Sequence, residues 1–245
     1  MVLSVSRLSK AYGGVQAVRD VSFGVAAGEM VAIIGPNGAG KTTCFNMVNG
    51  QLAPDSGEVR LGDASLAGLP PHRISRLGVG RTFQITATFG SMSVRENVQT
   101  ALLSHRRRNY AVWGRAGSSC GDEAEALLER VGIRSQADRQ CAVLAYGDLK
   151  RVELAIALAS RPRLLLMDEP TAGMAPDERG ALMALAASLA RGDHIGILFT
   201  EHDMDVVFGF ADRVIVMHLG EIIASGSPDQ VRADARVREV YLGDA

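Results

Sequence analysis

The sequence predicts an α/β fold whose core is a mainly parallel sheet. Three short apolar runs favour buried strands, namely Met30–Ile34, Arg163–Met167 and Ile195–Phe199. Such runs, rich in apolar side chains and bounded by turn residues, are typical of strands covered on both faces. Apolar residues with helical spacing occupy Gly180–Ala190, between the last two runs. Strands that alternate with helices favour a parallel sheet, because each helix returns the chain to the edge where the next strand begins.

Two further segments are predicted to join this core. At the front of the chain, apolar and polar residues alternate over Leu3–Leu8 and Val15–Phe23, as they do in strands with one buried face. From about residue 85 to residue 160 the spacing becomes mainly helical, for example over Asp122–Val131 and Leu149–Leu158. We therefore expect an N-terminal antiparallel β lobe and a helical lobe inserted into the core.

The remaining elements follow from shorter signals. A helix is expected from Gly40 through about Val48 and a strand over Val59–Leu61. Arg213–Met217 and Glu221–Ile223 are two short apolar runs separated by a turn, which predicts a terminal hairpin.

Composition and charge exclude several classes of protein. The chain has 245 residues, with 26 Lys and Arg against 27 Asp and Glu, for a net charge of -1. It lacks the positive field of a dedicated nucleic-acid binder, so no nucleic acid is expected as a partner. The three cysteines have no metal-ligand spacing, which fits a reducing compartment. No stretch approaches the roughly 20 apolar residues that span a bilayer, so we expect a cytoplasmic protein that reaches a membrane only through partners.

A glycine-rich loop carries the clearest chemical signal. Residues 35–42 match the phosphate-loop pattern G-x-x-x-x-G-K-[ST], directly after a buried run and at the start of a predicted helix. Backbone N–H groups of such a loop converge on phosphate oxygens, and the helix N-terminus adds partial positive charge. Lys41 is expected to reach the terminal phosphates and Thr42 to give its hydroxyl to Mg²⁺. The nucleotide contacts expected here are Gly35, Pro36, Asn37, Gly38, Ala39, Gly40, Lys41, Thr42 and Thr43.

Two carboxylates, Asp168 and Glu169, follow the apolar run that ends at Met167. Ligands of open α/β sheets gather at the carboxyl ends of strands. Asp168 is therefore expected to bind Mg²⁺, directly or through water, and Glu169 to act as the base for the attacking water. A solvated strand end before Pro170 would explain the pair alone, but the phosphate loop upstream favours the catalytic interpretation.

Four further signals complete a family pattern in the order in which they occur. They are Tyr12, Gln84, the segment Leu144–Asp148 and His202. With them the chain resembles the ABC-transporter ATPase family, with its P-loop NTPase core, over essentially its whole length. The resemblance implies ATP as the nucleotide and Mg²⁺ as the cofactor. It implies that Tyr12 stacks on adenine, that Gln84 binds Mg²⁺ and couples the lobes, and that His202 is the switch histidine. The residues expected to act in catalysis are Lys41, Glu169 and His202.

The segment Leu144–Asp148 falls at the family's LSGGQ signature, just before a predicted helix. The resemblance implies that this helix N-terminus presents N–H groups to a nucleotide held by a second subunit. The contacts implied are Leu144, Ala145, Tyr146, Gly147 and Asp148. The sequence departs from the family where Ala145 replaces serine, Tyr146 glycine and Asp148 glutamine. Ala175 stands where the family has aspartate, which leaves open whether both composite sites of a dimer are fully active.

Four short segments resemble the ATPases of branched-chain amino acid importers, namely Arg81–Gln84, Leu144–Gly147, Glu201–Met204 and Val240–Gly243. That resemblance implies a dimer with a second ABC ATPase, two membrane permease subunits and, indirectly, a periplasmic binding protein. It places the chain on the inner face of the membrane. The transported compound is not encoded here, because the binding protein and the permeases choose it.

The family pattern also predicts how the single domain over residues 1–245 is divided. Residues 1–84 and 161–245 are expected to form the nucleotide-binding core with its β lobe. Residues 85–160 are expected to form the helical signature lobe, and residues from about 218 to 245 a C-terminal tail.

Two alternatives stay open. One is the ATPase of an exporter such as a lipopolysaccharide-export system, which shares the Tyr-Leu-Gly end but whose signature resembles the standard LSGGQ more closely. The other is a soluble ABC ATPase without a transport role, a class that usually has tandem ATPase domains or nucleic-acid-binding insertions.

Overall fold

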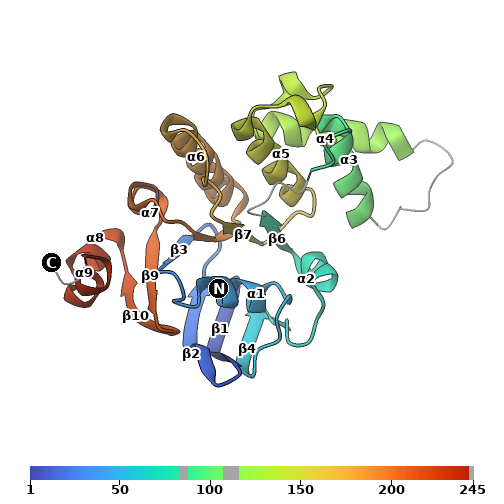
Figure 1. The fold of residues 1–245 in the computed structure, drawn as a ribbon. Coiled ribbons are helices and arrows are strands. Elements are labelled where there is room, and N and C mark those ends of the chain that lie inside the picture. The colour runs from blue at the N-terminus through green and yellow to red at the C-terminus, as the bar shows by residue number, and fades with distance from the viewer. Residues whose placement is uncertain (83–87, 107–115, 243–245) are drawn as a thin grey trace.

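The core of the protein is a six-stranded sheet with strand order β10-β9-β3-β8-β7-β6. The computed structural model describes residues 1–82, 88–106 and 116–242 (Figure 1). Neighbouring strands are parallel except β9 and β10, which form an antiparallel hairpin. The strands are β3 (Met30–Ile34), β6 (Val79–Thr82), β7 (Leu164–Asp168), β8 (Gly196–Thr200), β9 (Arg213–His218) and β10 (Glu221–Gly226). The predicted parallel core and terminal hairpin are confirmed.

A second, smaller sheet is formed by the front of the chain. It has the order β2-β1-β4-β5, and its paired strands are antiparallel. Its strands are β1 (Leu3–Tyr12), β2 (Val15–Val25), β4 (Ser56–Leu61) and β5 (Ala64–Ser65). This sheet is the antiparallel β lobe that the alternating pattern predicts, and it lies below the core sheet in Figure 1.

The helices fall into two groups. In the helical part at the upper right of Figure 1, α3, α4 and α5 pack on one another, and α5 also contacts β6. The others lie around the two sheets, as Figure 1 shows. The helices are α1 (Lys41–Val48), α2 (Pro71–Leu77), α3 (Val94–His105), α4 (Ala116–Arg130), α5 (Tyr146–Leu158), α6 (Pro176–Asp193), α7 (Met204–Phe210), α8 (Pro228–Ala233) and α9 (Ala235–Leu242), with 3-10 turns at Arg134–Gln136 and Cys141–Val143.

Strand β3 supplies side chains to two hydrophobic cores, one on each face of the core sheet. Met30, Ala32 and Ile34 belong to the core that includes α5 and α6. Val31 and Ile33 belong to the core shared with α1 and the β lobe. Successive side chains of a strand point to opposite faces, so a strand covered on both sides is apolar throughout. This explains why the run is continuous rather than alternating.

Two predicted helices have different limits in the structure. The helix expected over Gly180–Ala190 extends over Pro176–Asp193, and its first turn holds Asp177 and Glu178, as the helix dipole favours. The helix expected from Leu149 begins at Tyr146. The segment Leu144–Asp148 was expected to lie just before this helix. That expectation is wrong for its last three residues, 146–148, which form the first turn of α5. Ala145 is the N-cap and offers no side-chain hydrogen bond, so the usual sequence signal for a helix start is missing.

The start of α3 carries a full capping box. The Glu96 N–H donates to Ser93 Oγ at 3.2 Å, and the Ser93 N–H donates to Glu96 Oε2 at 2.7 Å. We expect Ser93→Ala to lower the free energy of unfolding by about 1 kcal/mol, which thermal unfolding would show as a fall in Tm of about 2–4 °C. Ser93→Thr keeps the hydroxyl and is the control. A Ser93→Ala Tm equal to that of the wild type would mean that the box contributes nothing.

Within residues 1–82, 88–106 and 116–242, no helix combines the length and the apolar character that crossing a membrane requires.

Candidate functional site

The phosphate-loop sequence connects β3 to α1, as predicted. Gly40 is the N-cap of α1, and the first backbone hydrogen bond of the helix runs from the Cys44 N–H to the Gly40 carbonyl at 2.9 Å. The amides of the first turn, Lys41 to Thr43, precede this bond and have no intrahelical acceptor. They form an N-terminus with partial positive charge, which is a suitable place for phosphate oxygens.

Two glycines hold the loop in a shape that no other residue would allow. Gly35 has φ 156°, and a Cβ there would come within 2.2 Å of the Met217 carbonyl oxygen. Gly40 has φ 100°, and its Cβ would come within 2.4 Å of the Ala17 carbonyl oxygen. The loop therefore rests directly on the backbones of β9 and β2. These contacts fix the turn that carries the amides.

Lys41 folds over this loop. Its Nζ donates hydrogen bonds to the carbonyl oxygens of Gly35 at 2.6 Å and Pro36 at 3.1 Å. The residue is only 8% exposed. Burial lowers the pKa of Lys41, whereas the negative charges of Glu169 and Asp168 raise it. The structure therefore places Lys41 within the electrostatic influence of both carboxylates.

Asp168 ends β7 and is held by two neighbours. Its Oδ1 accepts from the Thr200 hydroxyl at 2.8 Å, and its Oδ2 accepts from the Arg81 guanidinium at 3.2 Å. Thr200 ends the adjacent strand β8 and pairs with Asp168 in register. The Arg81 guanidinium also donates to Asn46 and Gln51, so it joins β6, β7 and the end of α1. Neither Thr200 nor the side chain of Arg81 was assigned a role from the sequence.

Glu169 and His202 meet across the ends of β7 and β8. His202 Nε2 lies 2.9 Å from Glu169 Oε1. Glu169 has φ 48°, an unfavourable backbone region for a residue with a Cβ, and its N–H donates to both the carbonyl and the hydroxyl of Thr200. The structure thus brings together a carboxylate and an imidazole that the sequence predicted separately.

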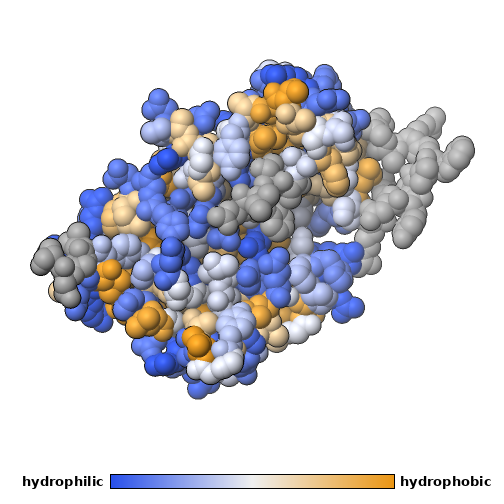
Figure 2. All heavy atoms as spheres, in the orientation of Figure 1, coloured by the Kyte–Doolittle hydropathy of each residue, from blue (hydrophilic) through white to orange (hydrophobic). Residues whose placement is uncertain are grey.

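The signature segment lies against the loop that follows β7 in the same chain. A Cβ on Gly147 would come within 3.1 Å of the Glu178 carboxylate, and one on Gly173 within 3.6 Å of the Tyr146 ring. No hydrogen bond between described residues joins the signature to Gly35–Thr42. Figure 2 shows hydrophobic side chains gathered at the upper end of this helical part, and the exposed large hydrophobic residues include Val143.

Tyr12 and Gln84 complete the predicted set. Tyr12 ends β1 and is 51% exposed, so its ring is not part of the core of the β lobe. Gln84 lies outside the described residues. Burial raises the pKa of Tyr241, a residue of α9 in the segment of the C-terminal resemblance, to about 12.

The donor set suits a hard divalent cation that is bound partly by the nucleotide. Thr42 at the start of α1 offers a hydroxyl, and Asp168 offers a carboxylate at the end of β7. Magnesium prefers oxygen ligands and usually takes only one or two carboxylates from the protein. The described part of the chain contains no cluster of three or more His, Cys, Asp or Glu that could hold a metal ion.

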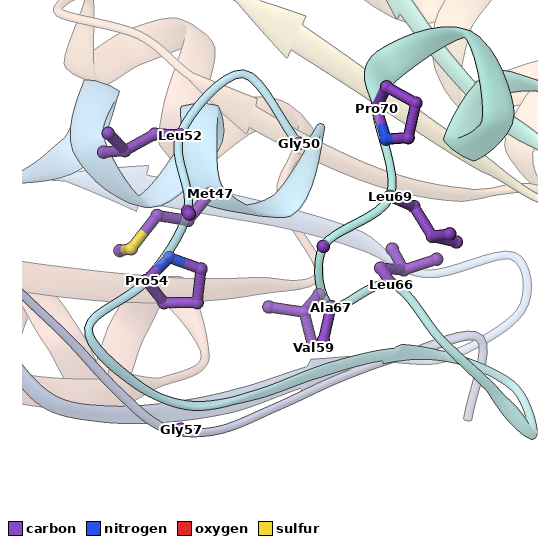
Figure 3. A pocket seen from close by; sticks show the side chains of 12 residues that line it. Met47, Gly50, Leu52, Pro54, Gly57, Val59, Leu66, Ala67, Leu69 and Pro70 are labelled. Atoms are coloured by element: carbon purple, nitrogen blue, oxygen red, sulfur yellow. The ribbon is translucent and has the colours of Figure 1, made fainter.

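An apolar pocket lies apart from this chemistry (Figure 3). It opens between the end of α1 and strand β4, where Met47, Leu52 and Val59 contribute side chains. None of the described residues that line it has an ionisable side chain. The pocket is therefore separate from the cluster formed by Lys41, Asp168 and Glu169, none of which lines it.

Comparison with protein families gives two matches. Residues 18–172 match the family described as ABC transporter. Residues 221–245 match the family described as branched-chain amino acid ATP-binding cassette transporter. The second match covers the segment that ends with α9.

Similar proteins cover the whole length of the chain. It is 40% identical over 253 residues to the high-affinity branched-chain amino acid transport ATP-binding protein LivG of Escherichia coli (strain K12), covering 100% of this chain and 98% of the relative. It is 38% identical over 248 residues to the lipopolysaccharide export system ATP-binding protein LptB of Acidithiobacillus ferridurans, covering 99% and 97%.

Solved structures agree with the fold. A crystal structure of the ADP conformation of MJ1267, an ATP-binding cassette of an ABC transporter, matches with a TM-score of 0.88 and 30% identity over 99% of each chain. A dimeric structure of MJ0796, a bacterial ABC transporter cassette, matches with a TM-score of 0.78 and 25% identity over 92% of this chain and 98% of the other. The chain therefore belongs to the ABC transporter family, as an ATP-binding subunit of the branched-chain amino acid type.

Proposed function

We propose that this chain hydrolyses ATP to drive import of branched-chain amino acids or related compounds through partner permeases. The observation that carries the ATPase assignment is the fixed loop Gly35–Thr42, whose Lys41 lies within the electrostatic influence of Asp168 and Glu169. The match of residues 221–245 and the likeness to LivG support the importer assignment.

Binding begins at the amides of the phosphate loop. Lys41 leaves the Gly35 and Pro36 carbonyls, which it caps in this structure, and donates to the terminal phosphates. Its ammonium then exchanges neutral carbonyl acceptors for charged oxygens, which form stronger hydrogen bonds. The first-turn amides of α1 add fixed partial charges at no reorganisation cost.

Thr42, Asp168 and Gln84 are the residues that we assign to Mg²⁺. When bound, the ion neutralises charge that develops on the phosphates during transfer. Arg81 and Thr200 hold the Asp168 carboxylate from two sides, and so they keep it at the end of β7.

Glu169 is assigned as the base that orients and deprotonates the attacking water. His202 contacts the same carboxylate and is assigned to hold it and to sense the terminal phosphate. Phosphoryl transfer needs little covalent help from the protein, so positioning and charge neutralisation by Lys41 supply most of the acceleration.

A second subunit completes the site in this proposal. The signature and the phosphate loop of one chain are not joined by a described hydrogen bond, and a related cassette forms a dimer. The signature residues Leu144–Asp148 would cap the nucleotide of the partner through the N-terminus of α5. Ala145, Tyr146, Asp148 and Ala175 depart from the family pattern, so the two composite sites of a heterodimer can differ in activity.

We assign coupling to the helical lobe, residues 85–160, and to Gln84 at its junction with the core. The remaining divisions, 1–84 with 161–245 as the core and about 218–245 as a C-terminal tail, belong to the same proposal. The chain would act at the inner face of the membrane, bound to two permease subunits, and indirectly to a periplasmic binding protein.

Copurification from gently solubilised membranes of the native host tests the assignment. Two multispanning proteins and a second ATPase would support the importer, and ligands of the neighbouring binding protein would then identify the cargo. Envelope-export components would instead favour an exporter ATPase, for which the likeness to LptB is the specific observation. Ribosomal or DNA-repair proteins without any permease would overturn the transport role.

The exposed ring of Tyr12 gives a separate prediction. If it stacks on adenine, Tyr12→Ala should weaken ATP binding by about 1–3 kcal/mol, by analogy with base–aromatic stacking. Tyr12→Phe keeps the ring and should bind nearly as well as the wild type. Calorimetric titration with ATP measures both, and an unchanged Kd for Tyr12→Ala would remove the stacking role.

A further inference from the structure

Four consecutive side chains, Thr200 at the end of β8 and the three that follow it, bond with residues between the end of β7 and the first turns of α6. The pairs are Thr200 with Asp168, Glu201 with Thr171, His202 with Glu169, and Asp203 with Arg179. The first and third pairs contain residues already assigned to catalysis or metal binding. Glu201 and Thr171 have no assigned role in catalysis or metal binding, and yet both residues are buried.

Glu201 is an unusual residue to bury. It is 4% exposed, and a carboxylate in such a place costs free energy unless hydrogen bonds compensate. Its Oε1 accepts from the Thr171 N–H at 2.8 Å and from the Thr171 hydroxyl at 2.7 Å. Burial raises the pKa of Glu201, the bonds from Thr171 and the His202 backbone lower it, and the charge of Glu169 raises it. The side chain is therefore directed at one specific partner.

Thr171 occupies a critical position on the opposite segment. It lies two residues after Glu169, whose φ of 48° is unfavourable and persists only where the surroundings enforce it. The Thr200 carbonyl and hydroxyl fix the Glu169 N–H on one side. Glu201 fixes the backbone on the other side, through the Thr171 N–H. The strained residue is thus held on one side by Thr200 of β8 and on the other by Glu201, which follows β8.

The outer pair extends the same arrangement. Arg179 donates to the Asp203 carboxylate at 2.6 Å and to the Met174 carbonyl at 2.9 Å. Asp203 is also the N-cap of α7, where its Oδ1 accepts from the Asp205 N–H at 3.0 Å. The loop between Thr171 and Arg179 is therefore tied at both of its ends to residues that flank His202.

We propose that Glu201 is a positioning residue, which holds the Thr171 backbone so that Glu169 and His202 keep the relative geometry that hydrolysis requires. The role rests on the proposed ATPase activity. Among the described residues, the side chain of Glu201 bonds with Thr171 and not with the phosphate loop. We therefore infer that it acts through Glu169 and not on the nucleotide.

The first experiment compares two substitutions in the full-length chain. Glu201→Ala removes the acceptor, and we expect kcat for ATP to fall by up to about 100-fold, as a displacement near 1 Å at the reacting groups can produce. The Kd for ATP should stay within about twofold, because the phosphate loop is unchanged. Glu201→Gln keeps an oxygen that accepts from Thr171, and it should restore most of the rate.

Thr171 provides a milder, matched pair. Thr171→Val removes the hydroxyl but leaves the backbone N–H, and kcat should fall about fivefold, the equivalent of one net hydrogen bond. Thr171→Ser keeps the hydroxyl and should recover most of the rate. This pair keeps the test valid if Glu201→Ala does not fold. Equal rates for valine and serine would contradict the proposal.

A double variant with Glu169→Gln shows whether Glu201 acts by positioning Glu169 or affects hydrolysis independently of it. Because Glu201 acts through Glu169, Glu201→Ala should slow the Glu169→Gln protein by less than about twofold. The proposal would be overturned if Glu201→Ala lowered kcat as much in the Glu169→Gln protein as in the wild type. It would also be overturned if Glu201→Ala kept the wild-type kcat, or if Glu201→Gln were as slow as Glu201→Ala.

Amide hydrogen exchange over residues 169–174 measures how firmly Glu201 holds the Thr171 backbone, and it requires no ATP hydrolysis. Exchange should be faster in Glu201→Ala than in the wild type or Glu201→Gln. If the wild type bound ATP without hydrolysing it, the proposed function would fail. Hydrogen exchange would still show whether Glu201 holds the Thr171 backbone. If hydrolysis is present and Glu201→Ala changes neither exchange nor kcat, only the positioning role fails.

Discussion

Replacement of Lys41 by alanine should weaken ATP binding by about 2–5 kcal/mol, or roughly 30- to 4,000-fold in Kd. The reason is that the β- and γ-phosphates would lose the one ammonium that the loop supplies, whereas the amides at the start of α1 would remain. Lys41 is 8% exposed and already covers the Gly35 and Pro36 carbonyls, so its removal leaves this end of the loop open to water. Titration with ATP in the presence of Mg²⁺ measures the change.

Lys10→Ala is the matched control for this experiment. Lys10 belongs to the β lobe, and among the described residues its ammonium pairs with Asp55 at 2.6 Å and not with the phosphate loop. Its loss should leave the Kd for ATP unchanged. Thermal unfolding of both variants checks that they fold. A Lys41→Ala protein that binds ATP as tightly as the Lys10→Ala protein would reject the phosphate-loop assignment.

Replacement of Glu169 by glutamine should leave ATP binding almost unchanged and slow hydrolysis by about 10²–10⁴-fold, the usual contribution of a general base. The amide keeps the size of the side chain and its contact distance to His202, but it cannot accept the proton of the attacking water. ATP would then persist between two subunits, so closed dimers should accumulate. Turnover assays and size-exclusion chromatography with ATP measure the two effects.

Glu129→Gln gives the control for charge removal. Glu129 is an exposed residue of α4 that pairs with Arg134 at 3.5 Å, so its neutralisation should change neither turnover nor dimer content. Wild-type turnover in Glu169→Gln would refute the role of Glu169 as the base. Slow turnover without dimers would keep that role but contradict closure around ATP.

The phosphate loop and the acidic pair were predictable because each depends on residues within one short segment of the sequence. The phosphate loop needs glycines and a lysine within residues 35–42, and the acidic pair needs only the end of one apolar run. The supports of the acidic pair were not predictable. Thr200 and Glu201 reach Asp168 and Thr171 only because β7 and β8 pair in one particular register, and a register between strands separated by a long helix leaves no local signal.

Fold prediction succeeded and failed for related reasons. The central strands were found because burial on both faces makes them apolar throughout. The short elements α2 and β6 were missed, since seven and four residues are too few to show a period. The start of α5 was placed too late because glycine and aspartate, which occupy its first turn, are common in loops, and because Ala145 gives no capping signal.

The central position of β3 also determines when the chain is able to fold during synthesis. Residues 30–34 leave the ribosome early, but their neighbours in the sheet are β8 and β9, which end at Thr200 and His218. At a translation rate of about 5–20 residues per second, the strand waits roughly 10–35 s for its second partner. Until β8 is complete, an apolar strand with two unpaired edges is exposed to other nascent chains, and one edge stays unpaired until β9 is complete. Chaperone binding to the N-terminal half, and aggregation of chains cut before β9, are the expected cellular consequences of this strand order.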